Sequence, residues 1–152
     1  MTRVGKLFLA VFVLGVFFSF PASAQMSKTD LQEMYVEYLR QEGYLPSIDD
    51  DGDILFRASG SNYYIIIYED DPQFFQILLQ LNLGSISLET ALNAANYASR
   101  RSKVAKVFIS ESGRYASITA ELIFYKPEDF KPIFSRALRL ISNARENFES
   151  QL

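Results

Sequence analysis

Hydrophobic and polar positions first follow the period of a helix. Across residues 27–42, apolar side chains recur every three or four positions, which places them on one helical face. They are Leu31, Met34, Tyr35, Tyr38 and Leu39. Ser27 or Thr29 is placed to cap the start, and Gly43 to end the helix. The pattern predicts a first helix with a single buried face.

The period then changes to that of strands over residues 44–69. Asp51-Gly52 fits a tight hairpin turn, because glycine and aspartate tolerate the positive φ angles such a turn requires. A second turn follows at Gly60-Ser61-Asn62. Tyr63 to Tyr68 is apolar or aromatic at almost every position, which predicts a central strand covered on both faces.

Residues 74–83 could form a helix or a strand. The apolar positions alternate, as do the polar ones, and only Leu78 departs from the rule. One side has Phe75, Ile77, Leu79, Leu81 and Leu83, and the other has Gln76, Gln80 and Asn82. Asp70-Asp71-Pro72 precedes them and fits a single helical turn. We predict a fourth strand here, because strict alternation is the signature of a half-buried strand.

Two further helices and a hairpin complete the pattern. Ser87 is placed to cap a helix whose apolar face consists of Leu88, Ala91, Leu92, Ala95 and Ala98. Residues 104–110 and 115–125 predict a hairpin around Ser112-Gly113-Arg114. Pro127 opens a last helix that extends to about Phe148, with an apolar stripe along its length. Sequential strands joined by tight turns predict an antiparallel sheet and the α+β class.

The N-terminus has the three-part pattern of a secretory signal. Arg3 and Lys6 precede an uncharged apolar stretch at residues 7–20, and Ala22-Ser23-Ala24 fits a cleavage site. The apolar stretch is shorter than the roughly 20 residues a membrane-spanning helix needs. We therefore predict cleavage after Ala24, one mature domain at residues 25–152 with no membrane span, and a periplasmic or secreted location.

Composition narrows the chemistry. The chain has no histidine and no cysteine, which removes the commonest general base, many metal ligands and the Cys-His and Ser-His nucleophile pairs. The formal net charge of −3 does not favour nucleic-acid binding, which needs clustered basic residues. One basic segment, Arg100-Arg101-Ser102-Lys103 with Lys106, is interpreted as a solvated helix end. We expect a protein that is not an enzyme and holds no cofactor.

The aspartates at 49, 50, 51 and 53 raise the question of calcium. An EF-type loop needs glycine at its sixth position and glutamate at its twelfth. Counting from Asp49, those positions hold Ile54 and Gly60. We therefore expect a hairpin turn with solvated acids and no metal site.

Several segments resemble the YbjN-type domains. They are residues 43–48, 51–57, 63–68, 71–75 and 92–96, and the resemblance covers about residues 28–148. It implies a fold similar to type III secretion chaperones, with the order helix, three strands, helix, two strands, helix. The family consists of candidate sensory transduction regulators, and the related chaperones dimerise and hold extended peptide segments. No catalytic residue is implied. The export signal departs from those chaperones, which act in the cytoplasm.

The leading hypothesis is an exported protein-interaction module that binds a polypeptide partner, with a homodimer as one expected state. A sheet edge or outer face would accept an extended segment by strand addition. The candidate binding residues are Tyr115, Thr119, Ile123 and Tyr125 of the last strand. Two alternatives remain open: a carrier with an apolar pocket between the sheet and the last helix, and, ranked last, a hydrolase that uses carboxylates.

Overall fold

The computed structural model describes residues 26–152. In chain order the elements are α1 (Lys28–Gln41), β1 (Ser47–Ile48), β2 (Ile54–Ala58), β3 (Ser61–Ile66), β4 (Phe74–Asn82), α2 (Leu88–Arg101), β5 (Ala105–Ile109), β6 (Tyr115–Ile123), η1 (Pro127–Ile133) and α3 (Phe134–Glu149). The predicted α+β class and element order are confirmed. The predicted signal segment, residues 1–24, lies outside the described residues.

The strands form one antiparallel sheet in the spatial order β1-β2-β3-β4-β6-β5. β4 and β6 are the longest strands, and they pair along their whole length, from Phe74 opposite Ile123 to Asn82 opposite Tyr115. β5 and β6 form the predicted hairpin. Because β6 lies between β4 and β5, the sheet ends at β5 on one side and at the short strand β1 on the other.

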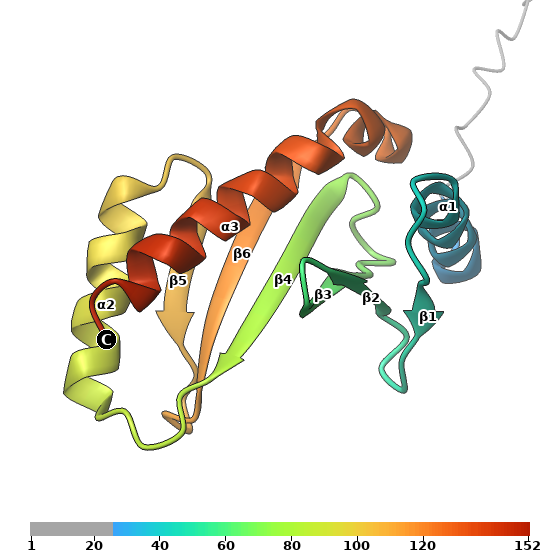
Figure 1. The fold of residues 1–152 in the computed structure, drawn as a ribbon. Helices are drawn as coiled ribbons and strands as arrows, with labels where there is room; N and C mark the ends of the chain where they lie inside the picture. Colours follow the sequence, from blue (N-terminus) through green and yellow to red (C-terminus); the bar gives the residue numbers. More distant parts are fainter. Residues whose placement is uncertain (1–25) are drawn as a thin grey trace, which may run out of the picture.

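The helices pack on one face of the sheet. α3 crosses the sheet obliquely and approaches α2 at its C-terminal end (Figure 1). Burial alternates along the strands: Ile54, Ile65 and Ile77 are 0 % exposed on the helix side. The neighbouring residues Leu55 and Leu78, on the opposite side, are only half-buried. No helix within residues 26–152 is long and apolar enough to cross a membrane.

An aromatic cluster fills the space between α1, η1 and the sheet. The ring of Phe130 lies 4.8 Å from those of Tyr35 and Tyr38 and 5.3 Å from that of Phe75. The Tyr38 hydroxyl also donates a hydrogen bond to the carbonyl of Lys131, at 3.1 Å. Burying each such ring stabilises the fold by about 1.5–3 kcal/mol, so this cluster fixes α1 to the rest of the domain.

Two predictions about local structure are confirmed. Ser27 caps α1 through its side chain, which accepts from the N–H of Asp30, and Ser87 caps α2 in the same way. Phe74–Asn82 is a strand. Its alternating side chains Phe75, Ile77 and Leu79 are all buried on the helix side. Alternation therefore outweighed the apolar richness that made a helix plausible.

Two other predictions were wrong in part. Residues 127–148 do not form one helix, because Pro127–Ile133 is a 3-10 helix and the α-helix begins at Phe134. Pro132 lacks an N–H and disfavours the α conformation at the residue before it, which accounts for the late start. The segment Tyr63–Tyr68 was expected to be covered on both faces. The helices cover it on one, where Tyr63 and Ile65 are buried.

The acidic segment forms the expected turn. Asp49 Oδ1 accepts hydrogen bonds from the N–H groups of Asp51, at 3.1 Å, and Asp53, at 2.9 Å. Gly52 has a φ of 89°, and a side chain there would collide with Lys28. Lys28 and Gln32 of α1 donate to the carbonyls of Asp51 and Gly52, which ties the turn to α1.

Candidate functional site

The face of the sheet turned away from the helices is the main candidate, and we call it the open face. One row of side chains crosses it in register on five strands. The row consists of Leu55, Tyr64, Leu78, Thr119 and Lys106, taken from β2 to β5. The adjacent row has Ile66, Gln76 and Glu121. Apolar and polar groups are therefore interleaved on this face, whereas the helix side is apolar apart from tyrosine hydroxyls.

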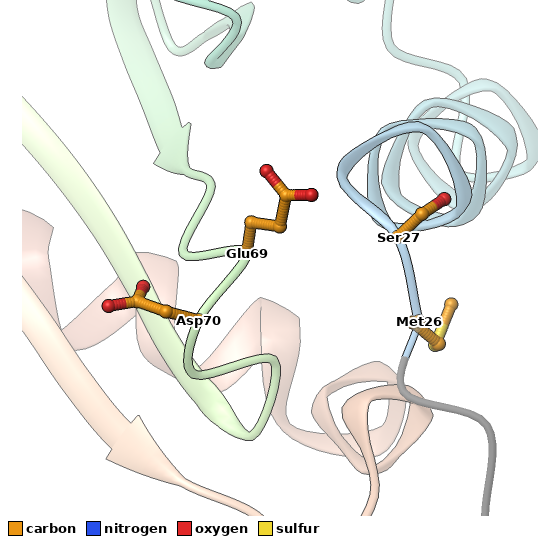
Figure 2. A pocket seen from close by; sticks show the side chains of 4 residues that line it. All are labelled: Met26, Ser27, Glu69 and Asp70. Atoms are coloured by element: carbon orange, nitrogen blue, oxygen red, sulfur yellow. The ribbon is translucent and has the colours of Figure 1, made fainter.

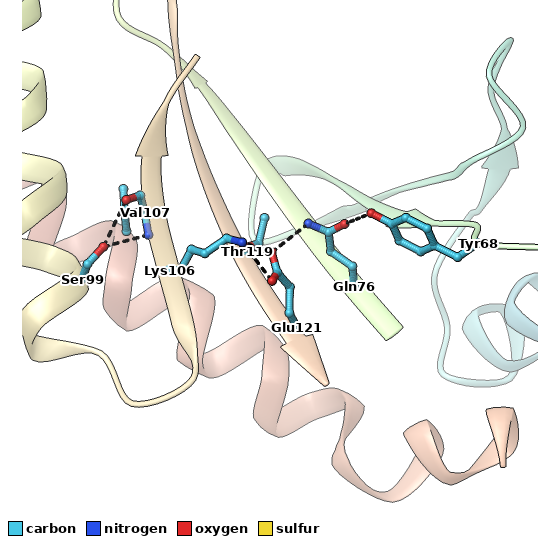
Figure 3. Close-up of polar contacts among 7 residues, drawn as sticks. All are labelled: Tyr68, Gln76, Ser99, Lys106, Val107, Thr119 and Glu121. Carbon is cyan, nitrogen blue, oxygen red and sulfur yellow. Dashed lines mark hydrogen bonds and ion pairs between the residues drawn. The ribbon is translucent and has the colours of Figure 1, made fainter. Parts of the chain in front are cut away.

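A hydrogen-bond network occupies the middle of the open face (Figure 3). Glu121 is its centre: its carboxylate accepts from Thr119 Oγ1 at 3.0 Å, Gln76 Nε2 at 3.2 Å and Lys106 Nζ at 2.9 Å. The Tyr68 hydroxyl extends the network by donating to Gln76 Oε1 at 2.6 Å. The negative charge of Glu121 thus has a cation and two neutral donors around it.

This network makes the polar part of the open face self-contained. Among the described residues, no buried side-chain nitrogen or oxygen is without a hydrogen-bond partner. Burial raises the pKa of the Tyr68 phenol, and the charge of Glu121 raises it further. Tyr68 therefore stays protonated at neutral pH and acts as a donor. Burying polar groups that already hydrogen-bond one another costs less free energy than burying unpaired polar groups.

Apolar side chains flank the network at opposite ends of the open face. Phe108 of β5 is 42 % exposed and Ile123 at the end of β6 is 79 % exposed. Lys106 Nζ lies 5.6 Å from the Phe108 ring, close enough for a cation–π contact. Ile123 is opposite Phe74, which is half-buried. An apolar–polar–apolar pattern therefore runs diagonally along β6.

The four predicted binding residues have different environments. Tyr115, at the start of β6, is half-buried opposite Asn82. Thr119 is 0 % exposed and holds Glu121, so it offers no surface to a partner. Ile123 and Tyr125 are 79 % and 83 % exposed, and Tyr125 lies beyond the end of β6. The structure therefore places exposed apolar surface at the Ile123–Tyr125 end.

The sheet edges differ in how they could receive another strand. β6 has neighbours on both sides. At the β5 edge the Ser99 hydroxyl of α2 accepts from the N–H of Val107 at 3.0 Å and donates to its carbonyl at 3.1 Å (Figure 3). This occupies the N–H and carbonyl of Val107, at the middle of β5, which an added strand would use. β1 has only two residues, preceded by Pro46, with Leu45 93 % exposed and Ile48 51 % exposed.

A surface cavity of about 640 Å³ lies between the start of α1 and the loop after β3 (Figure 2). Met26 and Ser27 form one wall, and Glu69 and Asp70 form the other. The lining offers the carboxylates of Glu69 and Asp70 and the Ser27 hydroxyl, which already donates to the Asp30 carboxylate at 2.6 Å. Within residues 26–152, no cluster of three or more acidic side chains is arranged to hold a metal ion.

The space proposed for a carrier pocket, between the sheet and the last helix, is occupied by side chains. Phe134, Ile141 and Phe148 of α3 are each 0 % exposed and pack into the core. The cavities described in residues 26–152 have surface side chains as their walls. A filled core weighs against the carrier hypothesis.

Sequence reasoning missed the residues that give the open face its character. Lys106 and Phe108 alternate with buried residues in β5, and this alternation is a signal that was present in the sequence. The pairing of Gln76 with Glu121 was not readable, because it depends on β4 lying next to β6. The contact of Ser99 with Val107 likewise depends on how α2 packs against β5.

No protein-family model and no curated protein matches the sequence. Solved structures resemble the fold, among them the following two. One is that of YbjN from E. coli, described as a candidate transcription regulator, with a TM-score of 0.58 and 12 % identity, over 78 % of this chain and 89 % of that one. The other is that of an uncharacterised protein from Methanothermobacter thermautotrophicus, with a TM-score of 0.54 and 12 % identity, over 80 % and 98 %. The fold is YbjN-like, as the sequence resemblance predicted.

Proposed function

We propose that this protein is a non-enzymatic interaction module that binds a polypeptide partner on the open face. One observation carries the proposal: among residues 26–152 no helix lies over one whole sheet face, which has exposed Phe108 and Ile123 on either side of a self-contained polar network. The regulatory description of the YbjN structure is in keeping with this class of function.

The chemistry of the open face suits burial under a partner. The Lys106–Glu121 pair, at 2.7 Å, is neutral overall, and Thr119 and Gln76 satisfy further acceptor positions of Glu121. A partner would therefore displace little tightly bound water from unpaired charge. Phe108 and the Ile123 end supply apolar anchors of the kind that dominate interface energies.

An extended segment is the partner geometry we favour. Phe108 pairs with Ser117, six residues before Ile123 on β6. At about 3.3 Å per residue, a strand-like segment of six or seven residues would reach from one anchor to the other. A segment that lies across the open face does not need a free strand edge. This is relevant because Ser99 already bonds the N–H and carbonyl of Val107 at the edge strand β5.

Export, and a homodimer as one functional state, are parts of the same proposal. The support for export is the sequence pattern at residues 1–24, and the support for the dimer is the resemblance to dimeric chaperones. The absence of histidine and cysteine from the sequence supports the non-enzymatic part.

Site-specific photo-crosslinking in expressing cells tests the proposal. A photoreactive residue placed at Phe108 or at Ile123 should give an adduct with the same distinct polypeptide. Leu92 on α2 is the matched control, since it is 51 % exposed but lies on a helix, and should not give that adduct. Adducts that form equally well from Leu92, or only from Leu92, would contradict the open face as the binding surface.

A further inference from the structure

The last turn of α2 has two arginines, Arg100 and Arg101, with no carboxylate partner among the described residues. Within residues 26–152 the ion pairs join Lys106 to Glu121 and Arg145 to Glu149, and neither includes Arg100 or Arg101. The sequence pattern alone suggested a solvated helix end. The structure instead places both arginines among the residues that line a surface cavity.

Two adjoining cavities share Tyr97 and Arg100, and we call them together the α2 groove. One, of about 280 Å³, is lined by Tyr97, Arg100 and Arg101. The other, of about 380 Å³, is lined by Thr90, Asn93, Asn96, Tyr97, Arg100 and Gln151. The C-terminal end of the chain lies beside α2 and supplies the Gln151 wall (Figure 1).

The lining is rich in hydrogen-bond donors and holds no carboxylate. The residues that line the groove include two arginines, the asparagines Asn93 and Asn96 and the tyrosine Tyr97. Gln151 forms a wall with its amide nitrogen already engaged, since it donates to Ser150. In a chain of net charge −3, an acid-free groove with two arginines is a local positive site.

One arginine is already held in position. The guanidinium carbon of Arg101 lies 4.4 Å from the centre of the Tyr97 ring, which is a cation–π contact. Stacking leaves the edge N–H groups of the guanidinium open to a ligand. It also reduces the side-chain freedom that binding would remove.

Two features at the C-terminal end of α2 reduce the repulsion that a nearby anion would meet there. Exposed carbonyls at a helix C-terminus repel negative charge. Here the carbonyl of Ala98 accepts from both the N–H and the hydroxyl of Ser102, at 3.1 and 2.9 Å. This satisfies one of the terminal carbonyls, while Arg100 and Arg101 supply two full positive charges.

We propose that the α2 groove binds the phosphate monoester group of a small ligand. Arg100 and Arg101 would each bind phosphate oxygens through two N–H groups, and the Asn93 and Asn96 amides would bind the rest of the ligand. A carboxylate presents two oxygens and one charge, which a single arginine satisfies. Two guanidinium groups on one cavity match a dianion with three terminal oxygens. This site lies on α2, away from the open face, and does not depend on the proposed function.

The test is a titration of the purified protein with glucose 6-phosphate, followed by NMR of the arginine Nε–H and asparagine amide signals. Glucose and glucuronate at the same ionic strength are the comparison ligands. We expect saturable shifts with glucose 6-phosphate alone. The Arg100→Gln/Arg101→Gln variant should raise the dissociation constant at least about tenfold. Equal binding of glucuronate would overturn the proposal, as would the absence of saturable shifts together with no binding to the vesicles described below.

A matched control separates a built site from simple charge. Arg136→Gln/Arg139→Gln removes the same charge from exposed positions of α3 and should leave the dissociation constant unchanged. Equal weakening by both double variants would overturn the site. If the α2 double variant does not fold, Asn96→Asp places a carboxylate in the groove and should weaken binding to a similar extent.

The source of the monoester is settled by a second arm. Phosphatidylcholine vesicles with added phosphatidic acid present the same group on a membrane surface. Co-sedimentation that requires Arg100 and Arg101 would assign the ligand to lipid, while binding of glucose 6-phosphate alone would assign it to a soluble metabolite. Binding in neither arm would refute the proposal.

Discussion

The same strands present two very different faces. On the helix side Phe75, Ile77 and Ile118 are at most 1 % exposed and belong to the hydrophobic core. On the open face Gln76 of β4 donates to Glu121 of β6, and Glu121 also accepts from Lys106. One face is stable because helices cover it, and the other because its polar groups satisfy one another.

The difference shows how burial can arise without a covering layer. Thr119 is 0 % exposed and Ser117 is 4 % exposed, although no helix of the described part of the chain lies over them. They are small residues on a central strand, and the longer side chains of neighbouring strands shield them. The buried Thr119 and Ser117 therefore lie lower on the open face than the exposed side chains of Phe108 and Ile123.

The largest effect should come from the covered face. Phe130→Ala removes a ring that is 0 % exposed and contacts the rings of Tyr35, Tyr38 and Phe75. We expect the free energy of unfolding in urea to fall by about 3–5 kcal/mol. Tyr125→Ala, which truncates an aromatic ring that is 83 % exposed, should cost under about 0.5 kcal/mol. Similar losses in the two variants would mean that the aromatic cluster does not anchor α1 and η1.

Next in size is the closure of the β5 edge by α2. Ser99→Ala leaves the N–H and carbonyl of Val107 without their side-chain partner. We expect a loss of about 1–2 kcal/mol and increased self-association in sedimentation velocity, since a free edge invites strand pairing. Ser102→Ala is the matched control, because its hydroxyl contacts a helix carbonyl and not the sheet. An unchanged sedimentation profile for Ser99→Ala would show that Ser99 does not protect the edge.

The centre of the open face should give a smaller effect. Glu121→Gln keeps the shape and an oxygen for Thr119 but removes the charge paired with Lys106. Because Lys106 is 57 % exposed, solvent screens the pair, and we expect a loss of only about 0.5–1 kcal/mol. A double-mutant cycle with Lys106→Met measures the coupling in urea unfolding. A coupling energy of zero would mean that Glu121 stabilises the fold only through its hydrogen bonds with Thr119 and Gln76.

The sequence pattern predicted which segments are strands more accurately than it predicted whether helices cover one or both faces of a strand. Alternation over residues 74–83 gave both the strand and its buried side, because period-two burial is a local property. The apolar content of Tyr63–Tyr68 predicted that both faces of this strand would be covered, but Tyr64 and Ile66 are half-buried on the open face. Aromatic and β-branched residues suit a half-covered sheet surface as well as a core.

The contacts that define the candidate sites were harder to predict, since they join distant segments. Gln76 meets Glu121 only because β4 pairs with β6 and not with β5. Pro132 was visible in the sequence, yet the apolar stripe around it predicted an uninterrupted helix. The groove at Arg100 and Arg101 depends on Gln151 from the end of the chain. Local sequence propensity does not determine which distant segments pack together.

The smallest effect should be a pH dependence at the acidic turn. Burial raises the pKa of Asp53 above its ordinary value of 3.8, and the charges of Asp49 and Asp51 add to this, whereas the hydrogen bond from Ile67 N–H and the charge of Lys28 lower it. The protonated form therefore favours folding. Its contribution to stability is present below the unfolded pKa and is lost as pH rises through the folded pKa.

Asp53→Asn should therefore become more stable relative to the wild type as pH rises from about 3 to about 7, while its amide oxygen still accepts from Ile67. Asp30 should behave oppositely, because hydrogen bonds from Ser27 lower its pKa. Its contribution is present above the unfolded pKa and is lost as pH falls through the folded one. Asp30→Asn should thus lose stability at neutral pH and approach the wild type in acid. Unfolding curves across this range measure both variants, and parallel pH profiles for the two would contradict the assignment of burial to Asp53 and helix capping to Asp30.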